Sequence, residues 1–128
     1  MTHRVRHTKQ RAAILDTLEA MNRPLSLDEI QVGARERCPG IGERTIFRNL
    51  KEMMDEYLLV RVFLPGKPTL YELPTGEHRP HFICRNCDQV FQLPGETPEV
   101  MSRYKAPPEF EIDGEDVVFF GRCPACKK

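Results

Sequence analysis

The sequence lacks an excess of either charge, and it lacks any long apolar run. Its 128 residues carry 19 basic and 19 acidic side chains, so the formal net charge is zero at pH 7. No overall electrostatic field therefore points to nucleic acid or to a membrane surface. No apolar stretch approaches the roughly 20 residues of a membrane-spanning helix, and the polar first residues do not resemble a secretory leader. We therefore expect a cytoplasmic protein without a membrane partner.

The motifs of the common enzyme classes are also lacking. The chain has no glycine-rich phosphate loop, no nucleophile elbow and no His-Glu-x-x-His pair. Its carboxylates are plentiful, but solvated surfaces explain most of them. We therefore expect no enzymatic activity and no small-molecule substrate.

The N-terminal half begins with the pattern of two helices. Thr8 can cap a first helix whose apolar residues follow at helical spacing. In the stretch "PLSLDEI", Ser26 and Glu29 have the spacing of a capping box. Leu25 and Ile30 occupy the two positions of a hydrophobic staple around it. This stretch predicts the start of a second helix, which ends near "CPG".

A third helix and a hairpin are predicted next. The stretch "ERTIFRNLKEMMDEY" follows Gly42 and carries one apolar stripe, formed by Ile46, Leu50, Met53 and Tyr57. Two β-rich runs, "LLVRVFL" and "TLYEL", are joined by "PGKP" and predict a hairpin. Three helices followed by a hairpin are typical of a winged helix-turn-helix, whose third helix enters the major groove of DNA. We assign this unit to residues 1–75.

The outer face of the third helix carries side chains suited to DNA. Opposite the apolar stripe, Arg44, Arg48 and Lys51 can reach phosphates or guanine edges. Thr45 and Asn49 can reach bases. A charged outer face is also how any surface helix looks, so periodicity alone leaves both interpretations open.

Residues 1–11 form a short basic arm that holds no acidic residue. Its cations are Arg4, Arg6, Lys9 and Arg11. Such an arm tracks phosphates, although a solvated chain start would look the same. The helix order, the hairpin and the arm together favour DNA binding.

The C-terminal half, residues 76–128, is predicted to be a small α+β unit after a turn-rich linker near residues 73–80. We expect a strand around the first cysteine pair, a short helix capped by Thr97, and a hairpin through Asp113-Gly114. The apolar run 117–120 would be buried on both faces of a strand. Because so few apolar residues make a poor monomeric core, we predict a homodimer sheet.

Two Cys-x-x-Cys pairs are the most specific signal in the chain. They are Cys84 with Cys87 and Cys123 with Cys126. Two such pairs complete a tetrahedron of thiolates for one structural Zn²⁺ per chain, with no coordination position left for water. The intervening residues 88–122 exceed the 15–20 residues, roughly, of an ordinary zinc ribbon. A redox dithiol is the alternative, but no βαβ pattern surrounds the pairs. Cys38 is expected to be a small, partly buried apolar residue, with a lone reactive thiol as the alternative.

With these residues in place, the chain resembles the ferric uptake regulator family of metal-dependent transcriptional repressors over nearly its full length. "RHTKQRAAIL", "PLSLDEI" and "IGERTIFRNL" are similar to its first helix, its second-helix opening and its recognition helix. "YELPTGEHRPHFICRNC" and "FFGRCPAC" resemble its dimer domain and cysteine knuckles. The resemblance implies a homodimer bound to a palindromic operator in double-stranded DNA.

The resemblance also implies residue roles on the DNA side. Arg6 matches a basic residue that enters the minor groove, and Thr45, Phe47 and Arg48 match the signature of the recognition helix. Phe47 replaces the usual tyrosine, so contact with a thymine methyl can persist while the hydroxyl is lost. Asp88 replaces the glycine that usually follows the first knuckle, which is expected to strain that turn.

The family's regulatory metal sites are implied only in reduced form. The residues that stand at matching ligand positions are Glu72 and His81 for the main sensing site and His78, Glu99 and Glu115 for a second site, where Glu115 replaces a usual histidine. Pro24, Arg79 and Pro80 occupy further ligand positions and cannot bind a cation. Either a reduced set still binds Fe²⁺, Mn²⁺ or Zn²⁺, or the sensing site is lost. Arg79 favours loss, because a cation at that position repels a metal.

A second class of function stays open at this point. The zinc unit could stabilise a protein-interaction module that has no specific DNA binding, and the zero net charge is the feature that keeps this alternative. The dependence of DNA affinity on salt distinguishes the two, because only a DNA-binding dimer gives a steep negative slope.

Overall fold

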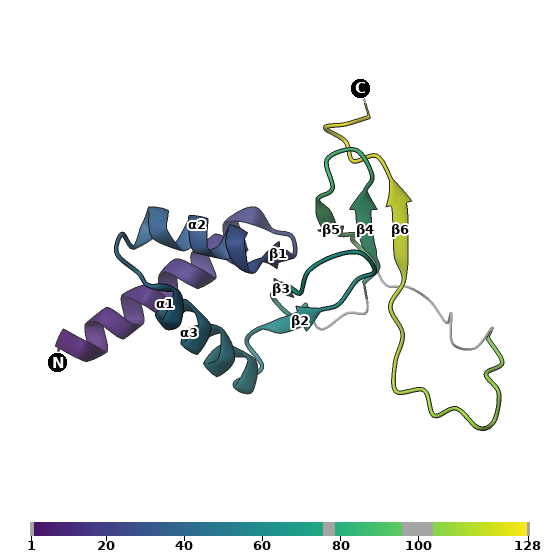
Figure 1. Ribbon diagram of the computed structural model, residues 1–128, viewed down its shortest axis with the longest axis horizontal. Coiled ribbons are helices and arrows are strands. Elements are labelled where there is room, and N and C mark those ends of the chain that lie inside the picture. The colour runs from purple at the N-terminus through teal and green to yellow at the C-terminus, as the bar shows by residue number, and fades with distance from the viewer. Residues whose placement is uncertain (1, 76–78, 96–103, 128) are drawn as a thin grey trace. The chain divides into compact units, whose positions relative to one another are not determined.

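The computed structural model describes residues 2–75, 79–95 and 104–127, and for residues 2–7 it describes the backbone alone. The chain divides into two compact units, Met1–Pro74 and Thr75–Lys128, which we call the first and second units. Each unit has a three-stranded sheet of its own (Figure 1). In the part of the chain that is described, no helix is both long and apolar enough to cross a membrane.

The first unit is a winged helix-turn-helix, as the sequence predicts. Its elements in order are α1 (Thr2–Met21), β1 (Leu25–Ser26), α2 (Leu27–Arg37), α3 (Glu43–Asp55), β2 (Val60–Val62) and β3 (Leu70–Glu72). β2 and β3 form the expected antiparallel hairpin, in which Val62 pairs with Leu70. The short β1 adds a third strand on the other side of β3, with Leu25 opposite Tyr71. The sheet order is therefore β1-β3-β2.

The start of α2 confirms the predicted capping box. The Ser26 hydroxyl accepts a hydrogen bond from the Glu29 backbone N–H at 3.3 Å, and the Glu29 carboxylate accepts one from the Ser26 N–H at 3.1 Å. The guanidinium of Arg23 donates to the other oxygen of Glu29 at 2.5 Å. Leu25 and Ile30, the staple residues, are fully buried. Reciprocal bonds of this kind satisfy amides that a helix start leaves open.

The core of the first unit lies between its three helices and its sheet. Its buried apolar side chains are Ala13, Ile14, Leu18, Leu25, Ile30, Ala34, Ile41, Ile46, Leu50, Met53 and Leu59. α1 and α2 pack so closely that a Cβ on Gly33 would lie 2.2 Å from Cγ2 of Thr17. A side chain at Gly33 is therefore incompatible with this helix packing.

Three expectations about the helices are corrected. α1 begins at Thr2, so Thr8 lies inside the helix and does not cap it. α3 ends at Asp55, and Tyr57 leaves the apolar stripe with a positive φ of 60° and a side chain that is 87% exposed. Asn49 is fully buried and its Nδ2 donates to the Thr45 carbonyl at 2.8 Å, so it does not face DNA. Asn49 lies three residues after Ile46, and the helical period therefore places it on the buried stripe.

The second unit contains a mixed sheet of three strands. β4 (His81–Cys84) pairs antiparallel with β5 (Val90–Gln92) and parallel with β6 (Val118–Gly121), so the order is β5-β4-β6. The predicted strand around the first cysteine pair is therefore a pair of strands, β4 and β5, with the knuckle between them. The predicted helix capped by Thr97 lies outside the described residues.

The predicted hairpin through Asp113-Gly114 is wrong. Residues 104–117 contain no strand, and β6 pairs with the distant β4 instead of with a strand just before Gly114. The flanking segment "EFEIDGED" is rich in acidic residues. Because like charges placed opposite each other destabilise an antiparallel pair, this segment is a poor hairpin.

The apolar run 117–120 is not buried within its own unit. Val117 and Val118 are half-buried, whereas Phe119 is 51% and Phe120 is 50% exposed. β6 is an edge strand of the sheet. The unit therefore leaves two aromatic side chains accessible at a sheet edge.

Candidate metal centre and nucleic-acid interface

The four predicted cysteines come together at one end of the second sheet. Their sulfur atoms all lie within 4.8 Å of one another. Cys84 ends β4, and the second pair follows the end of β6. Because β4 and β6 run parallel, with Cys84 opposite Gly121, the two cysteine pairs lie at the same end of the sheet. The parallel pairing therefore assembles the cysteine centre from two distant segments.

The geometry of the cysteine centre suits a tetrahedral metal ion. Sγ of Cys87 lies 3.8 Å from Sγ of Cys123. A Zn–S bond of about 2.3 Å in a tetrahedron requires sulfur separations of about 3.8 Å. Backbone N–H groups of Cys87 and Cys123 each donate to Sγ of Cys84 at 3.4 Å, as thiolates in knuckles require. The donor set therefore fits Zn²⁺ with all four positions filled by protein.

Hydrogen bonding also prepares Cys84 for metal binding. The backbone N–H of Cys87 lowers the pKa of the Cys84 thiol to about 6, against the opposing effect of desolvation, and the N–H of Cys123 adds to the shift. Since the thiolate is the ligand form, the knuckle holds this sulfur ready for a cation.

The turn of the first knuckle contains the strain that the sequence predicts. Asp88 has a positive φ of 67°, and its N–H donates to the Cys84 carbonyl at 2.9 Å. This backbone region favours glycine, although aspartate tolerates it better than most residues. The left-handed turn closes the loop around Cys84 and Cys87.

Three of the expected regulatory ligands lie among the described residues, in two different units. Glu72 is half-buried at the end of β3, His81 is buried at the start of β4, and Glu115 is half-buried before β6. His78 and Glu99 lie outside the described residues. Among the residues that are described, the four cysteines are the only group of three or more histidine, cysteine or acidic side chains within reach of one ion.

The outer face of α3 presents a row of cations. Arg44, Arg48 and Lys51 are exposed at spacings of four and three residues, which aligns them on one side of the helix. Phe47 is 47% exposed beside them, and Thr45 is half-buried. This face offers donors for phosphates and base edges together with one apolar contact.

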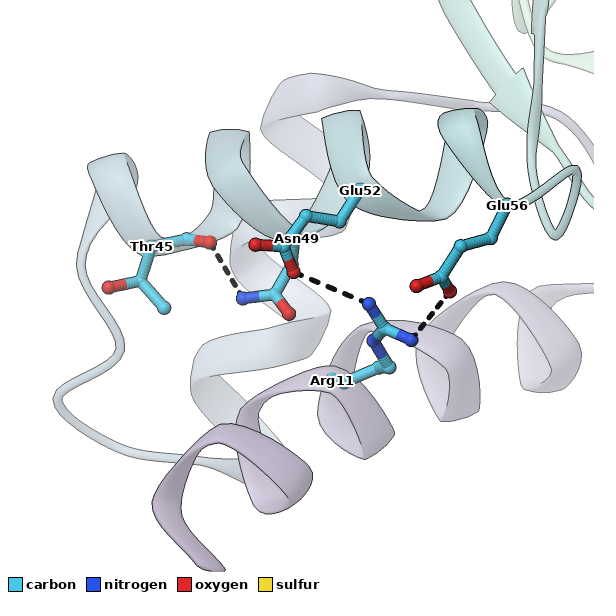
Figure 2. A network of polar contacts seen from close by, with 5 residues as sticks. All are labelled: Arg11, Thr45, Asn49, Glu52 and Glu56. Carbon is cyan, nitrogen blue, oxygen red and sulfur yellow. Dashed lines mark hydrogen bonds and ion pairs between the residues drawn. The ribbon is translucent and has the colours of Figure 1, made fainter. Parts of the chain in front are cut away.

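The residues of the basic arm belong to α1 and differ in their surroundings. Lys9 is exposed, and the side chain of Arg6 lies outside the described residues. Arg11 is held between two carboxylates, with Nη1 donating to Oε2 of Glu56 at 2.8 Å and Nη2 donating to Oε2 of Glu52 at 3.3 Å (Figure 2). Its expected use as a phosphate contact therefore competes with an ion pair inside the unit.

This ion-pair network is a feature that sequence reasoning missed. One signal was present, because Glu52 and Glu56 stand one turn apart at the end of a helix whose last turn has no basic residue. Such a pair requires a cation from elsewhere. Nothing in the sequence identified Arg11 as that cation.

Comparisons with known proteins agree with this architecture. The model of the Ferric uptake regulator family matches residues 2–114. The ferric uptake regulation protein of Bordetella parapertussis is 29% identical over 94% of this chain and 88% of its own length. The zinc uptake regulation protein of Mycobacterium tuberculosis is 27% identical over 96% of this chain and 95% of its own length. The iron-containing ferric uptake regulator of Francisella tularensis has a similar structure, with a TM-score of 0.69, 23% identity, and coverage of 94% and 92% of the two chains.

The geometry of the cysteine centre and the family match both indicate a zinc site. The four thiols have the separation and the backbone hydrogen bonds of a closed zinc site. Their position after two parallel strands makes the metal a link between segments far apart in the chain. The centre is therefore a structural zinc site rather than a catalytic one.

Proposed function

We propose that this chain, which belongs to the ferric uptake regulator family, is a cytoplasmic transcriptional repressor that binds a palindromic DNA operator as a homodimer. The observation that carries the proposal is the exposed row of Arg44, Arg48 and Lys51 on the third helix of a winged helix-turn-helix. A helix of this kind fits the major groove, and its cations supply phosphate contacts and base readout. Repression needs no chemistry from the protein, since an occupied operator is enough.

Each side chain of the proposed interface has a distinct role. Arg48 donates to a guanine edge, and Phe47 contacts a thymine methyl group, while Thr45 is within reach of a base. Arg44 and Lys51 bind phosphates and fix the helix in the groove. Lys9 and Arg6 on α1 extend the contact along the backbone and into the minor groove.

Homodimer formation is supported by the second unit. Phe119 and Phe120 are about half exposed on the edge strand β6, and no other side chain among the described residues of the unit buries them fully. An exposed apolar sheet edge is a site for pairing with another chain. A second copy that buries this edge gives the two-fold symmetry of a palindromic operator.

Regulation by metal is proposed to be weakened or lost. Pro24, Arg79 and Pro80 stand where relatives of this type are expected to carry ligands, and a guanidinium repels a metal ion. The remaining candidates are Glu72, His78, His81, Glu99 and Glu115. Two or three mixed nitrogen and oxygen ligands would make at most a weak site for Fe²⁺ or Mn²⁺.

The metal hypothesis has a direct test. The purified dimer is expected to contain one zinc per chain, and its affinity for operator DNA is expected to stay unchanged when Mn²⁺ or Fe²⁺ is added. A second bound metal that raises the affinity would instead restore a sensing function.

DNA binding is tested by the affinity of the zinc-loaded dimer for a duplex selected from a random pool, measured across a range of salt concentrations. We expect a steep fall of affinity with salt, as released counterions require. Lys51→Ala is expected to weaken binding to all sequences and to reduce the salt slope by about 1, whereas Arg48→Ala costs roughly 1–3 kcal/mol on the selected duplex only. Lys105→Ala, which removes an exposed lysine from the second unit, is the matched control. A flat salt dependence would favour the protein-interaction module.

A further inference from the structure

We propose that Arg11 is a positioning residue for the DNA-reading helix and does not itself bind DNA. Its guanidinium holds the end of α3 against α1 and neutralises two carboxylates beside the DNA-binding face. This inference rests on the proposed DNA-binding function. It reassigns a cation that belongs, by sequence, to the basic arm.

The first argument is the direction of the Arg11 side chain. Its two terminal nitrogens donate to Glu56 at 2.8 Å and to Glu52 at 3.3 Å, and only 24% of the side chain is exposed. Its Nε is buried and finds no acceptor among the described residues. Figure 2 shows the guanidinium turned from α1 toward the last turns of α3. A phosphate contact requires free donors, and both terminal nitrogens of Arg11 are engaged by carboxylates of its own unit.

The second argument is the charge at the end of α3. Glu52 and Glu56 are one helical turn apart, where like charges repel. Both stand near the helix C-terminus, whose dipole is negative, and the last turn of α3 carries no basic residue of its own. Arg11 is a cation that offsets both unfavourable effects. Its removal would take one cation away from two carboxylates of the helix that meets the DNA phosphates.

The third argument is which polar side chains tie α3 to another element. Gly42 occupies its N-cap position and makes no side-chain hydrogen bond there. The buried side-chain amide of Asn49 donates to the Thr45 carbonyl of the same helix, so this bond does not tie α3 to α1. The Arg11 contacts cross between elements 41 and 45 residues apart in the chain. Together with the buried apolar face of α3, they therefore hold the α3 cations in a fixed orientation relative to the α1 cation Lys9.

The test is a double-mutant cycle on DNA binding. Arg11→Met removes the charge and keeps much of the side chain, and Glu52→Gln with Glu56→Gln removes the carboxylates. Affinity is measured for the selected duplex and for a random duplex, well below the unfolding temperature of every variant. We expect Arg11→Met alone to weaken binding to the selected duplex by about tenfold, within the range for coupled contacts. In the Glu52→Gln, Glu56→Gln background the same substitution should cost less than about twofold.

Two further readouts separate positioning from its alternatives. The salt slope should not change with Arg11→Met, whereas the exposed neighbour Lys9, substituted as Lys9→Met, should reduce the slope by about 1 in either background. The ratio of selected to random affinity should fall for Arg11→Met, because a misplaced helix loses base contacts first.

The outcomes are distinct. Equal losses in both backgrounds with a reduced salt slope would make Arg11 a phosphate contact and overturn the proposal. A lower unfolding temperature with unchanged affinities and an unchanged ratio would make its role purely structural, and it would also overturn the proposal. If the unsubstituted dimer fails to bind any duplex in a salt-dependent manner, the proposed function and this inference fall together.

Discussion

Asp88 and Tyr57 both adopt the left-handed backbone conformation at positions where glycine is the usual residue. Asp88 closes the first cysteine knuckle with φ of 67°. Tyr57 ends α3 with φ of 60°, while its N–H donates to the Met54 carbonyl and the Leu58 N–H donates to the Met53 carbonyl. These two bonds form the Schellman motif, whose left-handed position is usually glycine. Tyr57 is 87% exposed, so packing within its unit does not compensate for the strain.

Replacing this residue should therefore stabilise the first unit. Tyr57→Gly is expected to raise its free energy of unfolding by roughly 1 kcal/mol, because glycine adopts a positive φ without a Cβ clash. Urea denaturation measures the change. Tyr57→Ala is the matched control, since it removes the ring but retains Cβ, and it should leave stability nearly unchanged. A loss of stability in Tyr57→Gly would mean that the ring is packed in the full protein.

At the level of secondary-structure elements, α2 is held by a cap at its start and by close packing against α1 in its middle. Its start is fixed by the capping box of Ser26 and Glu29, and its middle approaches α1 at Gly33. The side chain of Arg37 donates to Oγ1 of Thr17 at 3.4 Å and to the Gly33 carbonyl at 3.1 Å. The close packing at Gly33 and the cap at Ser26 and Glu29 therefore make separate contributions to the free energy of unfolding.

Gly33→Ala should force α1 and α2 apart. The added Cβ would lie 2.2 Å from Cγ2 and 2.8 Å from Oγ1 of Thr17. Overpacking of this kind costs roughly 1–3 kcal/mol of unfolding free energy. Thr17→Ala removes both clashing atoms, so the double variant should lose less stability than the sum of the two single variants. Gly114→Ala, where nothing lies within 4 Å, should have little effect, and an equally small effect at Gly33 would contradict the close packing.

The cap of α2 predicts a loss of stability in acid. Burial by itself would raise the pKa of Glu29, but hydrogen bonds from Arg23 and from the Ser26 amide outweigh it, so its pKa lies below the ordinary 4.5. A carboxyl with a lowered folded pKa adds stability above its unfolded pKa, and this stability is lost as the pH falls through the folded value. Unfolding free energies measured from pH 7 to about 3 should show this loss.

The matching variant isolates this carboxyl. Glu29→Gln should be less stable at neutral pH and should lose less stability on acidification than the unsubstituted protein. Glu19→Gln, at an exposed position on α1, should keep the original acid profile. Parallel profiles for Glu29→Gln and the unsubstituted protein would show that the Arg23 pair contributes nothing to stability.

At the scale of the whole molecule, the two units owe their stability to different sources. The first unit has a continuous apolar core between helices and sheet. Within the described residues of the second unit, the buried apolar side chains are few, namely Pro80, Ile83, Cys84, Val90 and Cys123. In small zinc domains, metal binding supplies about 10–16 kcal/mol, and this free energy is folding free energy. The second unit should therefore depend on its metal, and the first should not.

Removal of zinc should unfold the second unit alone. A strong chelator, or Cys123→Ser, is expected to abolish its protection from amide hydrogen exchange while the helices of the first unit stay protected. Cys38→Ser is the matched control, because Cys38 packs against the core of the first unit and lies outside the cysteine centre. A single cooperative loss of protection across both units would show that they fold together.

Features that depend on neighbours in the chain or on ligand chemistry could be predicted from the amino-acid sequence. The capping box at Ser26 and Glu29 needs residues only three positions apart, and two Cys-x-x-Cys pairs imply a tetrahedral metal wherever they meet. The order of helices and hairpin, together with the motif resemblance, was enough for the winged helix and the family. Local spacing is preserved in any fold, so these predictions survive, whereas the Thr8 cap and the Asp113-Gly114 hairpin failed because they also depended on where the neighbouring helix and strand lie.

Contacts between residues that are distant in the chain could be identified only from the folded structure. Asn49 is internal because α3 turns that side toward the core, and Arg11 finds Glu52 and Glu56 only because α1 crosses the end of α3. The parallel pairing of β6 with β4, rather than a hairpin at Gly114, brings the second cysteine pair to the first. Partners of this kind are far apart in sequence, and their encounter depends on how whole helices and strands pack, which no local pattern encodes.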